Sequence, residues 1–149
     1  MRVVVQRVSR AGVEVEGKPV AGIERGILIL AAFRDGDSPQ ELDWMARKCL
    51  ELRIFEDEEG KMNRSLMDVG GEVLVVSQFT LYGDCRKGRR PSYSKSASAE
   101  TAVGLYEKFI EILSSYYPRV KEGIFGAKMK VNLINDGPVT LIIDRDGDE

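Results

Sequence analysis

One run of apolar residues restricts the fold of this chain more than any other feature of its sequence. Residues 26–33 are Gly-Ile-Leu-Ile-Leu-Ala-Ala-Phe, with no polar side chain among them. The length of the run suits a strand, and the lack of alternation between polar and apolar residues predicts that this strand is buried on both faces. Such a strand needs packed layers on both sides, which favours an α/β domain.

The segments around this run predict the order of the other elements. Ser38, Pro39 and Glu41 have the arrangement of a helix N-terminus with a capping box. We expect a single α/β domain over residues 1–149, in which a mixed, largely antiparallel sheet is flanked by two main helices. The expected helices start at residue 39 and cover residues 99–116, and the expected strands are residues 2–8, 12–15, 18–23, 26–33, 72–82, 124–132 and 139–143.

Composition excludes several classes of function. The 149 residues carry a net charge of −2, so no overall field attracts nucleic acid or a membrane surface. The chain has no histidine, which excludes Ser-His-Asp and Cys-His catalysis, histidine-based zinc sites and a histidine general base. Its two cysteines form no Cys-x-x-Cys pattern. No apolar run approaches the ~20 residues of a membrane span, and the first residues predict a strand instead of a signal peptide, so we expect a cytoplasmic protein.

Two short segments are candidates for a functional site. In the strand expected before the long polar loop, Gln78 and Thr80 follow apolar residues on one face, as they do where a strand leaves the core and enters a site. An edge strand that ends in water gives the same pattern. Residues 135–140 are Asn-Asp-Gly-Pro-Val-Thr, and the Gly137-Pro138 pair leaves two neighbouring carbonyls free of side-chain bulk. An ordinary β-turn is the alternative for that segment.

Taken together, these two segments resemble the signature motifs of D-aminoacyl-tRNA deacylases. The similarity covers essentially the whole chain, in order and at the length of the family. It implies a barrel-like sheet with two main helices, no cofactor and no metal. The matching segments are residues 1–8 (MRVVVQRV), 77–81 (SQFTL), 86–92 (RKGRRPS), 123–129 (GIFGAKM) and 135–140 (NDGPVT).

The resemblance also implies an activity. Members of the family hydrolyse the ester that joins a D-amino acid to the terminal adenosine of tRNA, and they release the free D-amino acid and the tRNA. They also remove glycine from mischarged tRNA and reject L-aminoacyl groups, so that they proofread chirality in translation. The implied partners of this chain are D-aminoacyl-tRNA, glycyl-tRNA and a second copy of the chain in a homodimer.

Roles for the residues of the selectivity site follow from the same resemblance. Gly137-Pro138 is expected to be a cis peptide whose two carbonyls enter the partner subunit's site, hold the substrate's amino group and block an L side chain. Arg7 is expected to hold this unit in orientation, with an exposed charge near a strand end as the alternative. Ala127 and Met129 are expected near the adenosine, and core packing is the alternative for both.

The implied catalytic residues are Gln78, Phe79 and Thr80, which are expected to line the aminoacyl and adenosine pocket. The backbone N–H of Phe79 is a candidate oxyanion donor. A threonine nucleophile needs an activating base, and neither motif supplies a histidine or a lysine. We therefore favour attack by water with help from the substrate's own 2′-OH, as the resemblance implies, over an acyl-enzyme on Thr80.

A polar loop adds a basic patch to this slightly acidic chain. Such a patch suits phosphates, and the resemblance assigns it to the acceptor stem of tRNA, although a solvated loop has the same composition. Two other classes of protein remain open, namely an RNA-binding module without enzymatic activity and a small-molecule esterase that uses Thr80 as its nucleophile. The basic residues of the loop are Arg86, Lys87, Arg89, Arg90 and Lys95.

Overall fold

A six-stranded sheet forms the centre of the computed structural model, which describes residues 1–147. Its strands are β1 (Arg2–Val15), β2 (Lys18–Ile23), β3 (Gly26–Ala32), β6 (Glu72–Ser77), β7 (Val120–Glu122) and β8 (Met129–Asp144). Their order is β2-β1-β3-β6-β7, and β8 pairs with the other side of β1. β1 runs antiparallel to β2, β3 and β8, whereas β3, β6 and β7 are parallel. The expected mixed, largely antiparallel sheet is confirmed.

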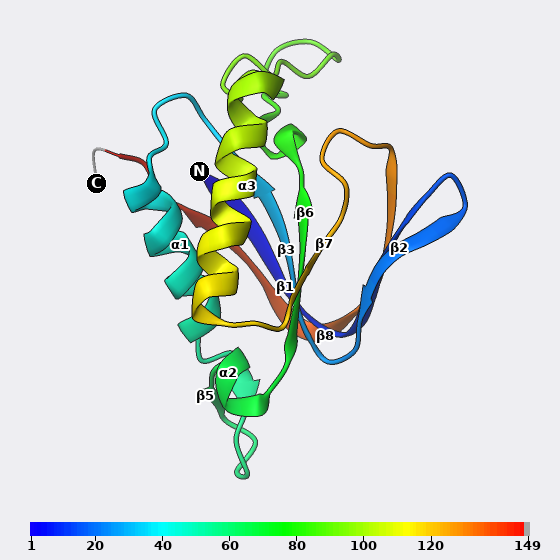
Figure 1. Cartoon of the computed structure of the whole chain (residues 1–149), viewed down its shortest axis with the longest axis vertical. Helices are drawn as coiled ribbons and strands as arrows, with labels where there is room; N and C mark the ends of the chain where they lie inside the picture. The colour runs from blue at the N-terminus through cyan, green and yellow to red at the C-terminus, as the bar shows by residue number, and fades with distance from the viewer. Residues whose placement is uncertain (148–149) are drawn as a thin grey trace.

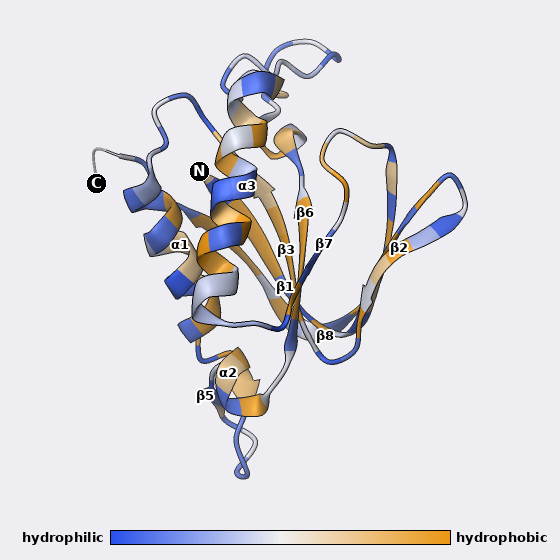
Figure 2. Cartoon of the chain, viewed as in Figure 1, coloured by the Kyte–Doolittle hydropathy of each residue, from blue (hydrophilic) through white to orange (hydrophobic). Residues whose placement is uncertain are grey.

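Two helices cover one face of this sheet. α1 (Pro39–Glu51) and α3 (Ala99–Tyr116) lie side by side there (Figure 1). Apolar bands on both helices turn toward the sheet, and blue, hydrophilic bands turn outward (Figure 2). Ser38 and Glu41 form the predicted capping box at the start of α1. Among the residues that the structure describes, no helix is both long enough and apolar enough to cross a membrane.

β3 lies at the centre of the sheet and is buried on both faces, as its apolar run predicts. Ile27 and Ile29 pack in the core beneath the helices. Leu28 points to the opposite face, where it meets Leu74 and Val76 of β6 in a second core. Two separate cores on the two faces explain why this strand carries no polar side chain.

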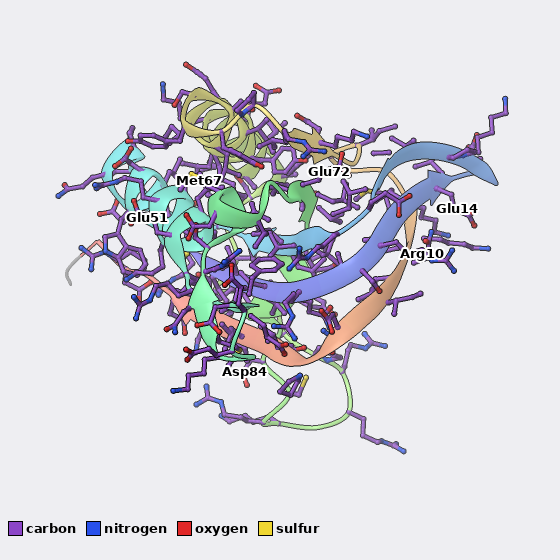
Figure 3. The ribbon with its side chains drawn as sticks, turned by 90° about the horizontal axis from the view of Figure 1, so that it is seen from below. Arg10, Glu14, Glu51, Met67, Glu72 and Asp84 are labelled. Carbon is purple, nitrogen blue, oxygen red and sulfur yellow. The ribbon has the colours of Figure 1, made fainter. Side chains whose placement is uncertain are left out.

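The second core exists because the sheet curls toward a barrel. β1 and β8 bow together, and the labelled Arg10 and Glu14 lie on the curved arm next to β2 (Figure 3). Lys121 of β7 donates a hydrogen bond to the carbonyl of Gly22 in β2 at 2.8 Å. The two ends of the path of strands therefore approach each other, and the barrel-like sheet that the resemblance implies is confirmed.

β1 is one strand of 14 residues, and the expectation of separate strands at residues 2–8 and 12–15 is wrong. Its register against β8 shifts around Val8 and Arg10, where a bulge bends the strand. β1 pairs with β3 before this bend and with β2 after it. The polar–apolar alternation breaks at the bend because the neighbouring residues Arg7 and Val8 are both buried, although the strand continues.

Short elements between α1 and β6 were not predicted. β4 (Phe55–Glu56) and β5 (Met62–Arg64) form a hairpin with a charged tip, and α2 (Leu66–Val69) is a single helical turn. Ser65 and Asp68 cap this turn reciprocally. Elements this short contain no full hydrophobic period, so pattern analysis does not detect them.

Candidate functional site

The Gly137-Pro138 unit lies in a bulge inside β8. On β1, Gln6 pairs with Thr140 and Val8 pairs with Asn135, so the single residue between them faces four residues of β8. The Gly137-Pro138 peptide bond is cis, as the resemblance implies. The alternative of an ordinary β-turn between two strands is wrong, because pairing with β1 resumes on both sides of the bulge.

The strands expected on either side of this unit belong to one strand. β8 starts at Met129 and continues to Asp144, whereas the expectation was separate strands at residues 124–132 and 139–143. Residues 124–128 form a turn and loop instead of a strand. A proline interrupts a strand pattern in sequence, but here it falls in the bulge, where no ladder hydrogen bond from its nitrogen is needed.

Arg7 holds the bulge from the helix-covered side of the sheet. The residue is only 3% exposed. Its Nε and Nη2 donate hydrogen bonds to the carbonyls of Asp136 and Gly137, each at 3.3 Å, and its Nη1 donates to the carbonyl of Ile54 at 2.6 Å. The Asp136 carboxylate lies 3.1 Å from Nε and balances the buried charge. Arg7 is therefore a buried anchor, and the alternative of an exposed surface charge is wrong.

The second motif begins where β6 ends. The strand stops at Ser77, and the 3-10 helix η1 (Phe79–Tyr82) follows, so the strand expected over residues 72–82 is wrong in its last part. The backbone N–H of Gln78 donates to the carbonyl of Ala31 at 2.7 Å, which fixes the start of the helix against the end of β3. The alternation of faces that the strand pattern predicts for Gln78 and Thr80 therefore does not apply.

Gln78 and Thr80 contact each other directly across this helical turn. The Gln78 side-chain amide donates a hydrogen bond to Thr80 Oγ1 at 2.6 Å. The first backbone hydrogen bond of the turn runs from the Leu81 N–H to the Gln78 carbonyl. The N–H groups of Phe79 and Thr80 precede this bond, so the helix itself offers them no acceptor. The turn thus presents two backbone donors and one hydroxyl at its start.

A cavity of about 410 Å³ opens beside the turn. Phe79 is 55% exposed and packs edge-on against Tyr93, with the ring centroids 5.2 Å apart, and both rings line the cavity together with Phe125. The sequence motifs do not single out Tyr93 and Phe125 as site residues. The only feature of the sequence that could have indicated them is that each is an aromatic residue within or directly after a segment that matches the family. Small side chains keep the rest of the space open, among them Ala31, Ser77, Ala97, Ala99 and Ala102.

The bulge and the 3-10 turn lie near opposite ends of the first half of β1. Arg2 donates a hydrogen bond to the Leu81 carbonyl of the turn at 3.0 Å, whereas Arg7 holds the Gly137 carbonyl of the bulge. The two arginines are five positions apart on one extended strand, so their Cα atoms are ~17 Å apart. Within one copy of the chain, the two motifs are therefore anchored at different positions along β1.

Comparison with known proteins determines the family. The family model described as D-Tyr-tRNA(Tyr) deacylase matches residues 4–144. The chain belongs to this family. The resemblance that the sequence motifs carry is thereby confirmed, and so is the expected enzyme class of hydrolase.

Relatives and solved structures agree with this membership. The D-aminoacyl-tRNA deacylase of Thermosipho africanus is 56% identical over 144 residues, 97% of either chain, and that of Clostridium acetobutylicum is 51% identical over the same shares. A solved structure described as c-Myc DNA Unwinding Element Binding Protein superposes with a TM-score of 0.93 at 44% identity, covering 99% of this chain and 100% of its own. A probable eukaryotic D-amino acid tRNA deacylase has a TM-score of 0.83 at 22% identity, over 97% and 98% of the chains, and shows the fold alone.

In this deacylase, Ala127 and Met129 lie outside the cavity beside Phe79. They line an open groove between the end of β1 and the start of β8. Met129 also packs against the second core. The groove and the cavity are neighbours along the chain, because Phe125 and Gly126 line the cavity immediately before Ala127.

The basic loop of the deacylase is exposed, but its cations differ in their surroundings. A bridge between Asp84 and Ser92 closes the loop, and Asp84 lies at its base (Figure 3). Arg86 is paired with Asp84 at 2.7 Å, and the hydrogen bonds from Arg86 hold the pKa of the Asp84 carboxyl well below its usual range. Within the part of the chain that the structure describes, Lys87, Arg89 and Arg90 make no ion pair.

The other reactive groups of the deacylase lie away from the cavity. Cys49 is buried in α1, and burial raises the pKa of its thiol to about 12, so that it stays protonated near neutral pH. Cys85 is exposed in the basic loop. Among residues 1–147, no three His, Cys, Asp or Glu side chains gather in a way that fits a metal ion.

Proposed function

We propose that this chain hydrolyses the ester bond of D-aminoacyl-tRNA and of mischarged glycyl-tRNA in the cytoplasm, and that it releases the free amino acid and the tRNA. Its role is chiral proofreading in translation, by rejection of L-aminoacyl groups. The observation that carries this proposal is the bulge around Gly137-Pro138, in which a buried Arg7 binds the carbonyls of Asp136 and Gly137, in a member of the D-Tyr-tRNA(Tyr) deacylase family.

The bulge acts as a filter made of backbone. A carbonyl oxygen accepts two hydrogen bonds, and Arg7 uses one position on Gly137, so that the oxygen retains capacity for the substrate's α-ammonium group. Asp136 neutralises the guanidinium beside this position and so reduces its repulsion of the incoming cation. An L side chain points at the fixed carbonyls, and a carbonyl left without its partner costs about 1–3 kcal/mol in addition to the steric overlap. Glycine has no side chain to reject, so the same filter accepts it.

The complete site forms in a homodimer, in which each copy inserts its Gly137-Pro138 bulge into the partner's site. The two motifs are held from different positions on β1 within one copy, Leu81 of the turn by Arg2 and Gly137 of the bulge by Arg7, which supports this arrangement. β8 is also suited to an interface, because it pairs with β1 on one side and lies at an edge of the described sheet. It exposes the apolar side chains of Ile134, Leu141 and Ile142, the last at 70%.

The cavity beside η1 holds the terminal adenosine of the tRNA. Its volume of about 410 Å³ lies in the range of small-ligand sites, and its aromatic walls suit the stacking of a base. Phe79 lines this cavity, and its neighbours Gln78 and Thr80 in the same turn direct the aminoacyl ester toward the filter. Ala127 and Met129 support the adenosine site from the adjoining groove, because they follow directly on the loop that lines the cavity.

Hydrolysis uses water and the substrate's own ribose. Gln78 occupies an acceptor position of the Thr80 hydroxyl, which leaves the hydroxyl proton free to donate to the substrate. A water molecule attacks the ester carbon, and the N–H groups of Phe79 and Thr80 stabilise the charge that develops on the carbonyl oxygen. The neighbouring 2′-OH assists this attack, and the ribose 3′-oxygen leaves with a proton. Thr80 positions the substrate in this scheme and forms no acyl-enzyme.

The exposed cations of the basic loop contact the acceptor stem of the tRNA. Lys87, Arg89 and Arg90 supply most of this attraction, because they make no ion pair within the described residues. Arg86 contributes less, since its charge is already balanced by Asp84. The interaction is therefore local and depends on salt.

A deacylation assay on D-Tyr-tRNA, L-Tyr-tRNA and Gly-tRNA at matched concentrations tests the proposed function. We expect rapid release of D-Tyr and Gly, with L-Tyr-tRNA spared. Equal rates on the D and L substrates contradict the filter, and release of amino acids from simple esters without RNA supports a small-molecule esterase instead.

A nucleic-acid-binding module is the second candidate. The structurally similar protein described as c-Myc DNA Unwinding Element Binding Protein favours it, together with the exposed cations of the basic loop. The same assay separates the two functions. A protein that binds nucleic acid tightly but leaves D-Tyr-tRNA intact over hours is a binding module, whereas turnover of the ester identifies the deacylase.

A further inference from the structure

Four residues of β8 loop out opposite Arg7, and the neck of this bulge is closed by one side chain. Asn135 stands at the entry to the bulge, and its Nδ2 donates two hydrogen bonds. One goes to the backbone carbonyl of Arg7 on β1 and the other to the carbonyl of Val139, each at 3.0 Å. The amide thus joins the two sides of the neck and the facing strand at a single point.

These bonds replace ladder bonds that the bulge removes. Between the pairs Val8–Asn135 and Gln6–Thr140, the two backbones are out of register, so regular pairing is interrupted there. A side-chain NH₂ group supplies two donors in the place of missing backbone donors. The acid of the same shape, aspartate, supplies none when it is ionised.

A chain of side chains sets the direction in which this amide faces. Gln6 Nε2 donates to Thr140 Oγ1 at 3.3 Å, and the Thr140 hydroxyl in turn donates to Asn135 Oδ1 at 3.5 Å. The Asn135 oxygen therefore turns toward Thr140, and its NH₂ group turns toward the two carbonyls. These hydrogen bonds run from Gln6 on β1 to Thr140 and Asn135, the two residues of β8 that flank the bulge.

We propose that Asn135 is a positioning residue of the chiral filter, and that it sets the direction of the Gly137 and Pro138 carbonyls by closing the neck of the bulge. It acts together with Arg7, whose backbone carbonyl binds Asn135 while its guanidinium binds the carbonyls of Asp136 and Gly137. Arg7 holds the looped-out residues on one side, and Asn135 joins the two ends of the loop. This inference rests on the proposed chiral rejection by the bulge.

The substitution Asn135→Asp tests the role, because it keeps the size of the side chain and removes both donors. Asn132→Asp is the matched control: it adds the same charge on the same exposed strand, at a side chain that makes no hydrogen bond among those described. We expect Asn135→Asp to raise the rate on L-Tyr-tRNA relative to D-Tyr-tRNA by about 10-fold, the equivalent of 1.4 kcal/mol of lost discrimination. Asn132→Asp leaves this ratio within about 2-fold of the wild type.

The ratio of the two rates separates positioning from general destabilisation. A loss of activity that is equal on both substrates, at an unchanged ratio, overturns the inference. If Asn135→Asp does not fold, the variant Thr140→Val tests the inference, because it removes the hydroxyl that orients the Asn135 amide. We expect it to shift the ratio of the two rates in the same direction by a few-fold. An unchanged ratio in Thr140→Val also overturns the inference. A wild type that hydrolyses both substrates equally overturns the proposed filter and this inference together, whereas a selective wild type with an equally selective Asn135→Asp overturns the inference alone.

Discussion

The bulge on β8 and the turn after β6 present opposite kinds of backbone hydrogen-bonding group. In the bulge, the side chains of Arg7 and Asn135 hold backbone carbonyls in place. Beside the turn, the cavity is lined by small side chains and four aromatic rings, those of Phe33, Phe79, Tyr93 and Phe125, and the turn supplies backbone N–H groups. One region presents backbone hydrogen-bond acceptors, and the other is a cavity beside backbone donors.

This difference indicates which region serves selectivity and which serves hydrolysis in the proposed mechanism. Carbonyls at fixed positions can reject a substrate, but they cannot stabilise an oxyanion, whereas N–H groups beside a cavity can do so. Neither region contains a histidine, and Thr80 is engaged by Gln78. In the proposed mechanism, selectivity and bond cleavage belong to residues held at different ends of β1, and substitutions in one region should leave the other property unchanged.

The largest effect is expected from a change in the substrate and not from a substitution in the protein. A D-Tyr-tRNA that ends in 2′-deoxyadenosine should react about 10²–10⁴-fold more slowly than the normal substrate, the usual range for the loss of a positioned proton-transfer group. Thr80→Ala should retain substantial activity. Single-turnover rates measure both. A stable acyl adduct on Thr80 in the mass spectrum contradicts this assignment and makes the turn a nucleophilic site.

The filter end is tested by Arg7→Lys. Lysine keeps the positive charge but cannot contact the carbonyls of Ile54, Asp136 and Gly137 together. Hydrogen bonds to a charged group contribute about 1.5–3 kcal/mol, so discrimination between D-Tyr-tRNA and L-Tyr-tRNA should fall by roughly 10- to 100-fold. Competition kinetics with both substrates give the ratio, and a thermal melt reports the accompanying loss of stability. Unchanged discrimination in a folded variant means that Arg7 does not orient the filter.

The cavity end is tested by Ala99→Leu. Ala99 lines the cavity at the exposed first position of α3, so a larger side chain there fills space at little cost to folding. We expect KM for D-Tyr-tRNA to rise about 10-fold, with the ratio of D to L rates unchanged. Gly104→Leu is the control, because Gly104 is exposed on the same helix and a Cβ atom added there meets no neighbouring atom within 4 Å. A change in chiral discrimination from Ala99→Leu indicates that the two regions are not separate.

The smallest effect concerns the basic loop. Asp84→Asn releases Arg86, so the affinity for tRNA should rise and the slope of log K against log salt should steepen by roughly 0.7–0.9. Neutralising Arg89 and Arg90 together should weaken binding and flatten that slope by roughly twice as much. Filter binding over a range of salt measures both variants, and slopes equal to that of the wild type exclude the loop from phosphate contact.

The ion pair of Asp84 and Arg86 also has an expected pH dependence. Because the folded protein lowers the pKa of the Asp84 carboxyl, the pair is fully formed above the normal pKa of aspartate and is lost only as the pH falls through the lowered value. The masking of Arg86 should therefore be constant between pH 5 and pH 8. Salt slopes that change for the wild type across this range, but not for Asp84→Asn, contradict the prediction.

Local signals in the sequence predicted much of the fold. The apolar run of β3, the capping box of Ser38 and the extent of α3 all depend on neighbouring residues, and the structure has them as predicted, except that β3 ends at Ala32, one residue early. The wrong predictions occur where contacts with residues distant in the sequence determine the local structure. The strand pattern continues through residues 78–82, but the Ala31 carbonyl captures the Gln78 N–H and the chain turns into a 3-10 helix.

What the sequence alone determined is the family, the residues of both motifs and the absence of a histidine base. The tertiary structure decided the rest: that Arg7 is buried beneath the bulge, that Tyr93 and Phe125 complete the cavity, and that the bulge and the turn lie apart within one chain. The physical reason is that hydrogen bonds such as those from Arg7 to Gly137, or from Asn135 to Arg7, join residues more than 120 positions apart. No local pattern carries that information, because β1 and β8 lie at opposite ends of the chain and are brought together only by their pairing in the sheet.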